Sequence, residues 1–169
     1  MLDISVIILT LNEELHIRRC IENVRSIAKQ IFVVDCFSTD RTADIAKELG
    51  AEVHQHEWPG NQAAQFNWAL ENLPITTEWV LRLDADEYLT SGLITEMDEQ
   101  LPKLSDDVTA VVFPNIFHDL YGLAVNLLRL QGVQLLRYSI DLSKTVSAAK
   151  DLLPKSCCRT DFRATRSSS

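Results

Sequence analysis

Apolar residues are arranged along this chain in short continuous runs that alternate with longer stretches of helical spacing. Residues 4–11 form a continuous, mainly apolar run rich in β-branched residues, which is typical of a strand covered on both faces. Residues 12–29 begin with Asn12-Glu13-Glu14, a favourable helix start, and carry apolar side chains every three to four positions. The pattern predicts a strand over 4–11 followed by a helix over 12–29.

The same alternation continues as far as residue 84. The predicted elements are a buried strand over 31–34, a helix from the capping sequence 38–40 to about residue 49, a short strand over 51–55, a helix over 61–72 and a buried strand over 79–83. Strands and helices that alternate at this spacing favour right-handed crossovers. We therefore expect an α/β fold with a Rossmann-like, mostly parallel sheet flanked by helices.

Segments with polar residues lie at the ends of three predicted strands. The segments are Thr10 to Glu13, Asp35, and Asp84 to Glu87. The carboxyl ends of parallel strands meet at one edge of a sheet, so these residues are expected to share a cleft there. The sequence lacks both Gly-x-Gly-x-x-Gly after the first strand and Gly-Lys-Ser/Thr, which excludes the dinucleotide fingerprint and the P-loop.

Asp84-Ala85-Asp86 is the strongest chemical signal in the sequence. An extended Asp-x-Asp points both carboxylates to one side, and the repulsion between them favours a cation. Hard oxygen ligands select Mg²⁺ or Mn²⁺ rather than zinc. The alternative is a solvated acidic turn after a strand.

Net charge argues against nucleic acid as a partner, because the 169-residue chain carries -8 at pH 7. The chain has no apolar run long enough to span a membrane, and Met1-Leu2-Asp3 lacks the basic start of a signal peptide. Its four cysteines contain no Cys-x-x-Cys pair, which favours reduced thiols. These features predict a cytoplasmic chain.

Charge is unevenly distributed, with a net -12 over residues 1–118 and +4 over 119–169. We therefore divide the chain into a domain over 1–118 and a divergent tail over 119–169. In one hypothesis residues 123–137 form an amphipathic helix that rests on an anionic membrane, and the end of the tail is disordered. In the other, the tail belongs to a frameshifted or truncated gene product and was never selected as structure.

Three segments resemble family 2 glycosyltransferases with the GT-A fold. They are Ser5-Val6-Ile7-Ile8-Leu9-Thr10-Leu11-Asn12-Glu13-Glu14, Val33-Val34-Asp35-Cys36-Phe37-Ser38-Thr39-Asp40-Arg41-Thr42 and Leu83-Asp84-Ala85-Asp86-Glu87. They occur in the family's order and spacing, and the resemblance covers about residues 3 to 115. Within the family the chain is most similar to bacterial transferases that build lipopolysaccharide core, capsule or exopolysaccharide.

The resemblance implies a hexosyltransferase-type, inverting enzyme that transfers a sugar from a nucleotide-diphosphate donor. It indicates a UDP-sugar donor and a saccharide or lipid-linked acceptor in cell-surface polysaccharide or lipopolysaccharide biosynthesis. The expected location is cytoplasmic, with peripheral contact at the inner face of the plasma membrane. The fold is expected to be incomplete at the C-terminus, where the family's acceptor half is not recognisable.

Residue roles are carried over from the resemblance position by position. The nucleotide-sugar-binding residues are Thr10, Asn12, Glu13, Asp35, Asn67 and Asp84, and the Mn²⁺ or Mg²⁺ ligands are Asp86 and Asp84. Simpler interpretations remain open for three of them: an ordinary helix cap for Asn12 and Glu13, and an exposed helix residue for Asn67. Asp40 is interpreted either as a structural support or as a ligand contact.

The catalytic base is not identifiable in the sequence. The family's downstream acidic motif and its Gln/Arg-x-x-Arg-Trp are both unrecognisable here. The alternative function is therefore a non-catalytic or degenerate nucleotide-sugar-binding fragment. A haloacid-dehalogenase-type phosphatase is a third reading of Asp-x-Asp, but that family places the motif on its first strand.

Overall fold

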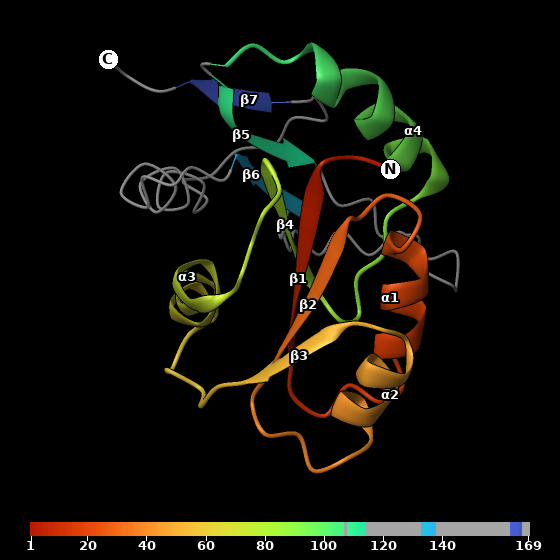
Figure 1. Cartoon of the computed structure of the whole chain (residues 1–169), viewed down its shortest axis with the longest axis vertical. Coiled ribbons are helices and arrows are strands. Elements are labelled where there is room, and N and C mark those ends of the chain that lie inside the picture. The colour runs from red at the N-terminus through yellow and green to blue at the C-terminus, as the bar shows by residue number, and fades with distance from the viewer. Residues whose placement is uncertain (107, 114–132, 138–162, 167–169) are drawn as a thin grey trace, which may run out of the picture.

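The computed structural model of the chain describes residues 1–106, 108–113, 133–137 and 163–166, and Figure 1 shows its elements. The strands are β1 (Ile4–Thr10), β2 (Gln30–Asp35), β3 (Glu52–Gln55), β4 (Trp79–Asp84), β5 (Val108–Phe113), β6 (Val133–Arg137) and β7 (Arg163–Arg166). The helices are α1 (Ile17–Val24), α2 (Thr42–Glu48), α3 (Gln62–Asn72) and α4 (Ser91–Gln100), and a 3-10 turn covers Leu101–Lys103.

The described strands form one sheet in the order β3-β2-β1-β4-β6-β5-β7. The first four pair in parallel, which confirms the expected α/β fold with a parallel sheet flanked by helices. The register places Thr10 opposite Asp35 and Leu9 opposite Asp84. Three polar strand ends therefore meet at one edge. The other three strands, β6, β5 and β7, pair antiparallel, an extension that the sequence pattern did not predict.

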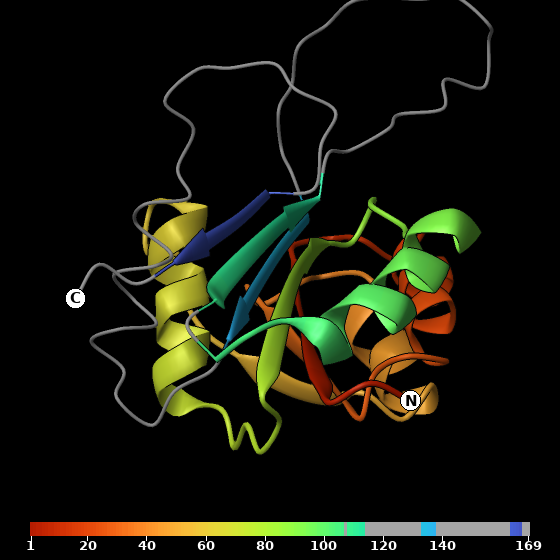
Figure 2. The same ribbon diagram turned by 90° about the horizontal axis from the view of Figure 1, so that it is seen from above.

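Helices cover both faces of the parallel sheet, as Figures 1 and 2 show from two directions. Helices α1, α2 and α4 lie on one face, and α3 lies on the other. Successive β1 side chains enter opposite layers: Ile8 belongs to the core under α1, and Ile7 to the core under α3. All seven β1 residues are buried, which confirms a strand covered on both faces.

The helix expected over residues 12–29 is shorter than predicted, because α1 spans only Ile17–Val24. Asn12 has a left-handed backbone (φ 58°) and therefore cannot continue into helix. The N-cap position belongs to His16, whose side chain makes no capping hydrogen bond. The interpretation of Asn12 and Glu13 as an ordinary helix cap is therefore wrong.

The tail contributes strands to the same sheet. Residues 133–137 form β6, so the amphipathic helix expected over 123–137 is wrong for this part. The rest of that proposed helix and the boundary at residue 118 lie outside the described residues. None of the described helices is long and apolar enough to cross a membrane.

Candidate functional site

The acidic loop, residues 84–87, begins where β4 ends at the carboxyl edge of the parallel sheet. Residues two apart on a strand share a face, so Arg82 and Asp84 both lie on the α3 side of β4. Arg82 Nη2 donates to Asp84 Oδ1 at 3.0 Å, and Gln62 Nε2 of α3 donates weakly to Asp84 Oδ2 at 3.5 Å. The Asp84 side chain is 17% exposed. Its carboxylate is therefore oriented by a cation and an amide.

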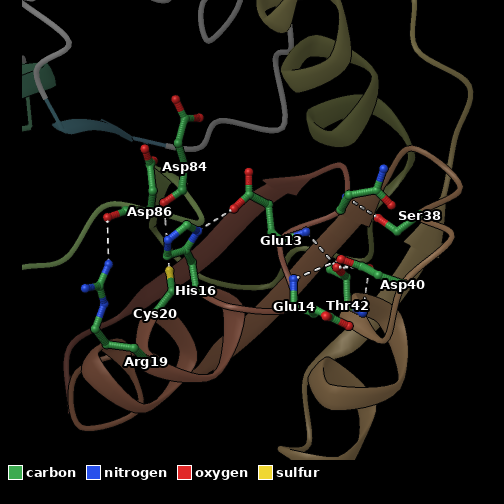
Figure 3. Close-up of polar contacts among 11 residues, drawn as sticks. Glu13, Glu14, His16, Arg19, Cys20, Ser38, Asp40, Thr42, Asp84 and Asp86 are labelled. Carbon is green, nitrogen blue, oxygen red and sulfur yellow. Dashed lines mark hydrogen bonds and ion pairs between the residues drawn. The ribbon is translucent and has the colours of Figure 1, made fainter.

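Asp86 is exposed and differs from Asp84 in its contacts. Its backbone oxygen accepts a hydrogen bond from Arg19 Nη2 at 3.0 Å, while its carboxylate pairs with no other described residue. Figure 3 shows the carboxylates of Asp84 and Asp86 projecting to the same side of the sheet edge. The loop thus presents one partnered and one unpartnered carboxylate.

This donor set fits Mg²⁺ or Mn²⁺. The described residues contain no group of three or more His, Cys, Asp or Glu side chains that could enclose a metal ion. Magnesium-type sites commonly use only one or two protein carboxylates and take their other ligands from substrate phosphates and water. Exposed carboxylate oxygens at Asp86, with Asp84 beside them, match that kind of site.

Helix α1 holds the acidic loop through three side chains, Arg19, Cys20 and Asn23, that the sequence did not single out as site residues. Cys20 Sγ approaches the Asp84 backbone oxygen at 3.9 Å, and Arg19 Nη2 donates to the Asp86 backbone oxygen (Figure 3). The Arg19 guanidinium also lies 5.4 Å from the Tyr88 ring centroid. Burial, with a smaller effect from Glu87, raises the pKa of Cys20 to about 12, so the thiol stays protonated. Asn23 makes two hydrogen bonds to the backbone of Leu89. Helix α1 therefore positions the whole loop.

Thr10 and Asp35 form a buried pair at the neighbouring strand ends. Thr10 Oγ1 donates to Asp35 Oδ1 at 3.0 Å, as their position in the β1–β2 register requires. Asp35 also accepts hydrogen bonds from the backbone N–H and hydroxyl of Ser38 and, at 3.4 Å, from Gln55. The Asp35 carboxylate is completely buried. In this structure it fixes the loop after β2.

Asn12 and Glu13 join the loop after β1 to the loop after β2. The Asn12 N–H donates to Ser38 Oγ, and its side-chain oxygen accepts from the Thr39 N–H. The Glu13 N–H donates to Thr42 Oγ1 at 2.8 Å, and the Glu13 carboxylate contacts His16 Nδ1 at 2.8 Å. Figure 3 shows the Glu13 carboxylate on the same side of the edge as Asp84 and Asp86. The two loops are therefore braced as one unit.

Asp40 completes this brace. Its carboxylate accepts hydrogen bonds from the Thr42 N–H and hydroxyl and from the Glu14 N–H. Burial opposes ionisation of Asp40, but these hydrogen bonds outweigh it and hold its pKa below the usual value. These contacts correspond to the structural-support interpretation of Asp40.

Helix α3 begins at the cap Asn61, whose side chain accepts from the Ala64 N–H. Gln65 is buried, and its amide makes hydrogen bonds to His56 Nδ1 (2.7 Å) and Cys36 Sγ (3.2 Å). Its side chain therefore has a structural role. Asn67 is half-buried on the same helix, and its side chain makes no hydrogen bond with another described residue. Thr10, Asn12, Glu13, Asp35 and Asp84 are thus brought together at the sheet edge, whereas no described contact connects Asn67 to them.

A parallel α/β sheet with polar loops gathered at its carboxyl edge is the layout of a nucleotide-binding α/β domain. Residues 5–158 match the sequence profile of Glycosyl transferase family 2, and the chain belongs to that family. The predicted family membership is therefore confirmed.

Relatives from bacteria match part of the chain. An uncharacterized glycosyltransferase of Rickettsia typhi is 43% identical over 95 residues, which cover 56% of this chain and 32% of that protein. The lipopolysaccharide core biosynthesis glycosyltransferase LpsC of Rhizobium meliloti is 34% identical over 112 residues, 63% of this chain and 40% of that protein. The matched region spans about a third of the length of the rickettsial relatives.

Solved structures share the fold. Glucosyl-3-phosphoglycerate synthase from Mycobacterium tuberculosis in complex with UDP has a TM-score of 0.60 and 16% identity, with 88% of this chain and 66% of that chain covered. The mannosyltransferase PcManGT from Pyrobaculum calidifontis, in complex with GDP-Man and Mn²⁺, has a TM-score of 0.51 and 23% identity, with 64% and 34% covered. At these identities the comparison establishes the GT-A-like fold alone.

Proposed function

We propose that the chain binds a nucleoside-diphosphate sugar, a UDP-sugar, and transfers the sugar to a saccharide or lipid-linked acceptor. The transfer is inverting and of hexosyl type, and serves cell-surface polysaccharide or lipopolysaccharide assembly. Membership of Glycosyl transferase family 2 supports the reaction class. The relative LpsC is named for lipopolysaccharide core biosynthesis, which supports the proposed pathway.

The observation that carries the proposal is the asymmetric pair of carboxylates after β4. Asp86 presents an exposed carboxylate with no partner among the described residues, and Asp84 lies beside it, held by Arg82. In the proposal Asp86 ligates Mn²⁺ or Mg²⁺, and Asp84 accepts hydrogen bonds from the donor's ribose or from water on the metal. A bound divalent cation offsets the negative charge of the departing nucleoside diphosphate.

The loops after β1 and β2 bind the nucleoside in this proposal. Thr10, Asn12 and Glu13 line the base and ribose, and Asp35 acts mainly by fixing Thr10 and Ser38, because its oxygens already accept four hydrogen bonds. Asn67 on α3 contributes a hydrogen-bond donor toward the ribose or diphosphate. An acceptor hydroxyl attacks the anomeric carbon and loses its proton to a carboxylate, which is not assigned among the described residues.

The test is calorimetric titration of the whole chain with UDP, with Mn²⁺, and with UDP in the presence of Mn²⁺. We expect Mn²⁺ to tighten UDP binding at least tenfold in the wild type, and Asp86→Ala to abolish that gain. Asp98→Ala is the matched control, because Asp98 is an exposed carboxylate on α4. UDP binding that responds neither to Mn²⁺ nor to Asp86→Ala contradicts the proposal.

Turnover separates the enzyme from a binding fragment. Incubation with radiolabelled UDP-sugars and a bacterial lipid extract should move label into the lipid or saccharide fraction. Mn²⁺-dependent UDP binding without any transfer of label favours the alternative, a non-catalytic nucleotide-sugar-binding chain.

A further inference from the structure

Arg82 is a cation enclosed in the sheet next to the acidic loop. Its side chain is 18% exposed and extends from β4 on the face covered by α3. Its Nη2 atom lies 3.0 Å from Asp84 Oδ1, 3.4 Å from Asp84 Oδ2 and 3.0 Å from Gln62 Oε1. One nitrogen of Arg82 therefore connects the strand, the acidic loop and the first turn of α3.

This arrangement is costly for stability. Arg82 Nε is buried and has no hydrogen-bond partner among the described residues, so none of their hydrogen bonds offsets its desolvation. An ion pair removed from water gains little over an apolar side chain of the same size. Packing in this strand favours apolar side chains, because the other residues of β4 before Asp84 are Trp79, Val80, Leu81 and Leu83. The arginine is therefore better explained by its effect on Asp84 than by packing.

Its effect on Asp84 is both geometric and electrostatic. The Nη2 atom of the guanidinium, together with Gln62, holds the carboxylate on the α3 side of the edge. The positive charge also cancels the charge of Asp84, so an approaching cation is attracted mainly by Asp86, whose carboxylate has no described partner.

We propose that Arg82 is a positioning residue that reserves Asp84 for the sugar donor and leaves Asp86 as the metal ligand of the Asp-x-Asp loop. The inference rests on the proposed function and assigns a residue outside the motif to it. It has an unusual consequence: removing the arginine releases Asp84 as a second metal ligand. Metal binding without donor should then become tighter, while donor binding becomes weaker.

The experiment measures Mn²⁺ binding without nucleotide, by the loss of the free-ion electron paramagnetic resonance signal, and UDP binding at saturating Mn²⁺, by calorimetry. For Arg82→Gln we expect Mn²⁺ affinity to rise about five- to tenfold, from the loss of one nearby positive charge, and UDP affinity to fall about tenfold. Arg82→Lys keeps the charge and should leave Mn²⁺ affinity near the wild-type value. Arg18→Gln, on the exposed face of α1, controls for the change in net charge.

A double-mutant cycle distinguishes action through Asp84 from a general effect of charge. In an Asp84→Asn background, Arg82→Gln should change Mn²⁺ affinity less than twofold. An equal gain in both backgrounds overturns the inference, as does a loss of Mn²⁺ affinity in folded Arg82→Gln. If Arg82→Gln does not fold, Arg82→Lys decides: unchanged Mn²⁺ affinity supports the inference, and a fivefold change in either direction overturns it.

The failure of this inference is separable from failure of the proposed function. A wild-type chain that binds neither Mn²⁺ nor UDP contradicts the proposed function itself. Wild-type binding that depends on Asp86, combined with any of the overturning results for Arg82, leaves the proposed function intact and removes only the role of the arginine.

Discussion

Asn23 binds the backbone of Leu89 through both ends of its amide: Nδ2 donates to the Leu89 oxygen at 2.9 Å, and Oδ1 accepts from the Leu89 N–H at 2.7 Å. Leu89 is buried and follows the acidic loop by only a few residues. The Asn23 side chain of α1 thus bonds both backbone groups of Leu89, as a neighbouring strand does in a sheet. The position of the acidic loop depends on a residue that carries no charge.

Asn23→Ala should lower the free energy of unfolding by about 2 kcal/mol, because it removes two hydrogen bonds and leaves two backbone groups of Leu89 unpaired. Urea unfolding measures this change. Asn72→Ala is the control, since Asn72 is exposed and makes one bond within α3; we expect about 0.5 kcal/mol or less there. Equal losses in the two variants contradict a special role for Asn23.

Phe37 adopts a left-handed backbone (φ 55°) and is 52% exposed, at the loop after β2. The left-handed conformation raises the free energy of a bulky residue by about 1–2 kcal/mol and that of glycine by less. Phe37→Gly should therefore be about 1 kcal/mol more stable than Phe37→Ala in urea unfolding, since both variants lack the ring. A Phe37→Ala variant as stable as Phe37→Gly rules out backbone strain at this position.

Asp40 should make stability depend on pH in acid. Burial raises the pKa of Asp40, but the hydrogen bonds from Thr42 and Glu14 together outweigh burial and lower the folded pKa. The contribution of Asp40 to stability is therefore present above the unfolded pKa of about 3.9 and is lost as pH falls through the folded pKa. Asp40→Asn should be less stable than wild type at pH 7, and the difference should shrink below about pH 4. Urea midpoints across this range measure it.

The control for Asp40 is Asp98→Asn, which removes one negative charge from the exposed surface of α4. A gap between wild type and Asp40→Asn that stays constant down to pH 2 contradicts the assigned hydrogen bonds.

Much of the parallel half of the fold follows from local pattern. The β1 run is apolar at nearly every position, and Asn61 is a strong cap, so the bounds of β1 and α3 differ from the predictions by only a residue. The start of α1 was mispredicted because Asn12 bonds Ser38 and Thr39, 26 and 27 residues away. A long-range contact of this kind leaves no trace in local spacing.

Two further features depend on tertiary pairing. Val133-Gln134-Leu135-Leu136-Arg137 suits a helix or a strand by its apolar pattern, and only pairing with β4 and β5 selects the strand. In the sequence Arg82 only interrupts the apolar run of β4. Its role becomes visible when the structure shows that its side chain contacts Asp84 on the same face of the strand. The importance of Asn23 has no sequence signal, because an asparagine on a helix is ordinary until its partner is known.

The place of β6 in the sheet has a consequence for the order in which the chain can fold during synthesis. The strands β1 to β4 are complete once residue 84 has been made, yet β4 pairs on its other side with β6, in which Arg137 lies opposite Trp79. Until those later residues emerge, the strand that carries Asp84 presents an edge of unpaired backbone N–H and C=O groups, the kind of edge that pairs with other chains. Nascent chains of this protein are therefore exposed to aggregation at the very strand that ends in the acidic loop.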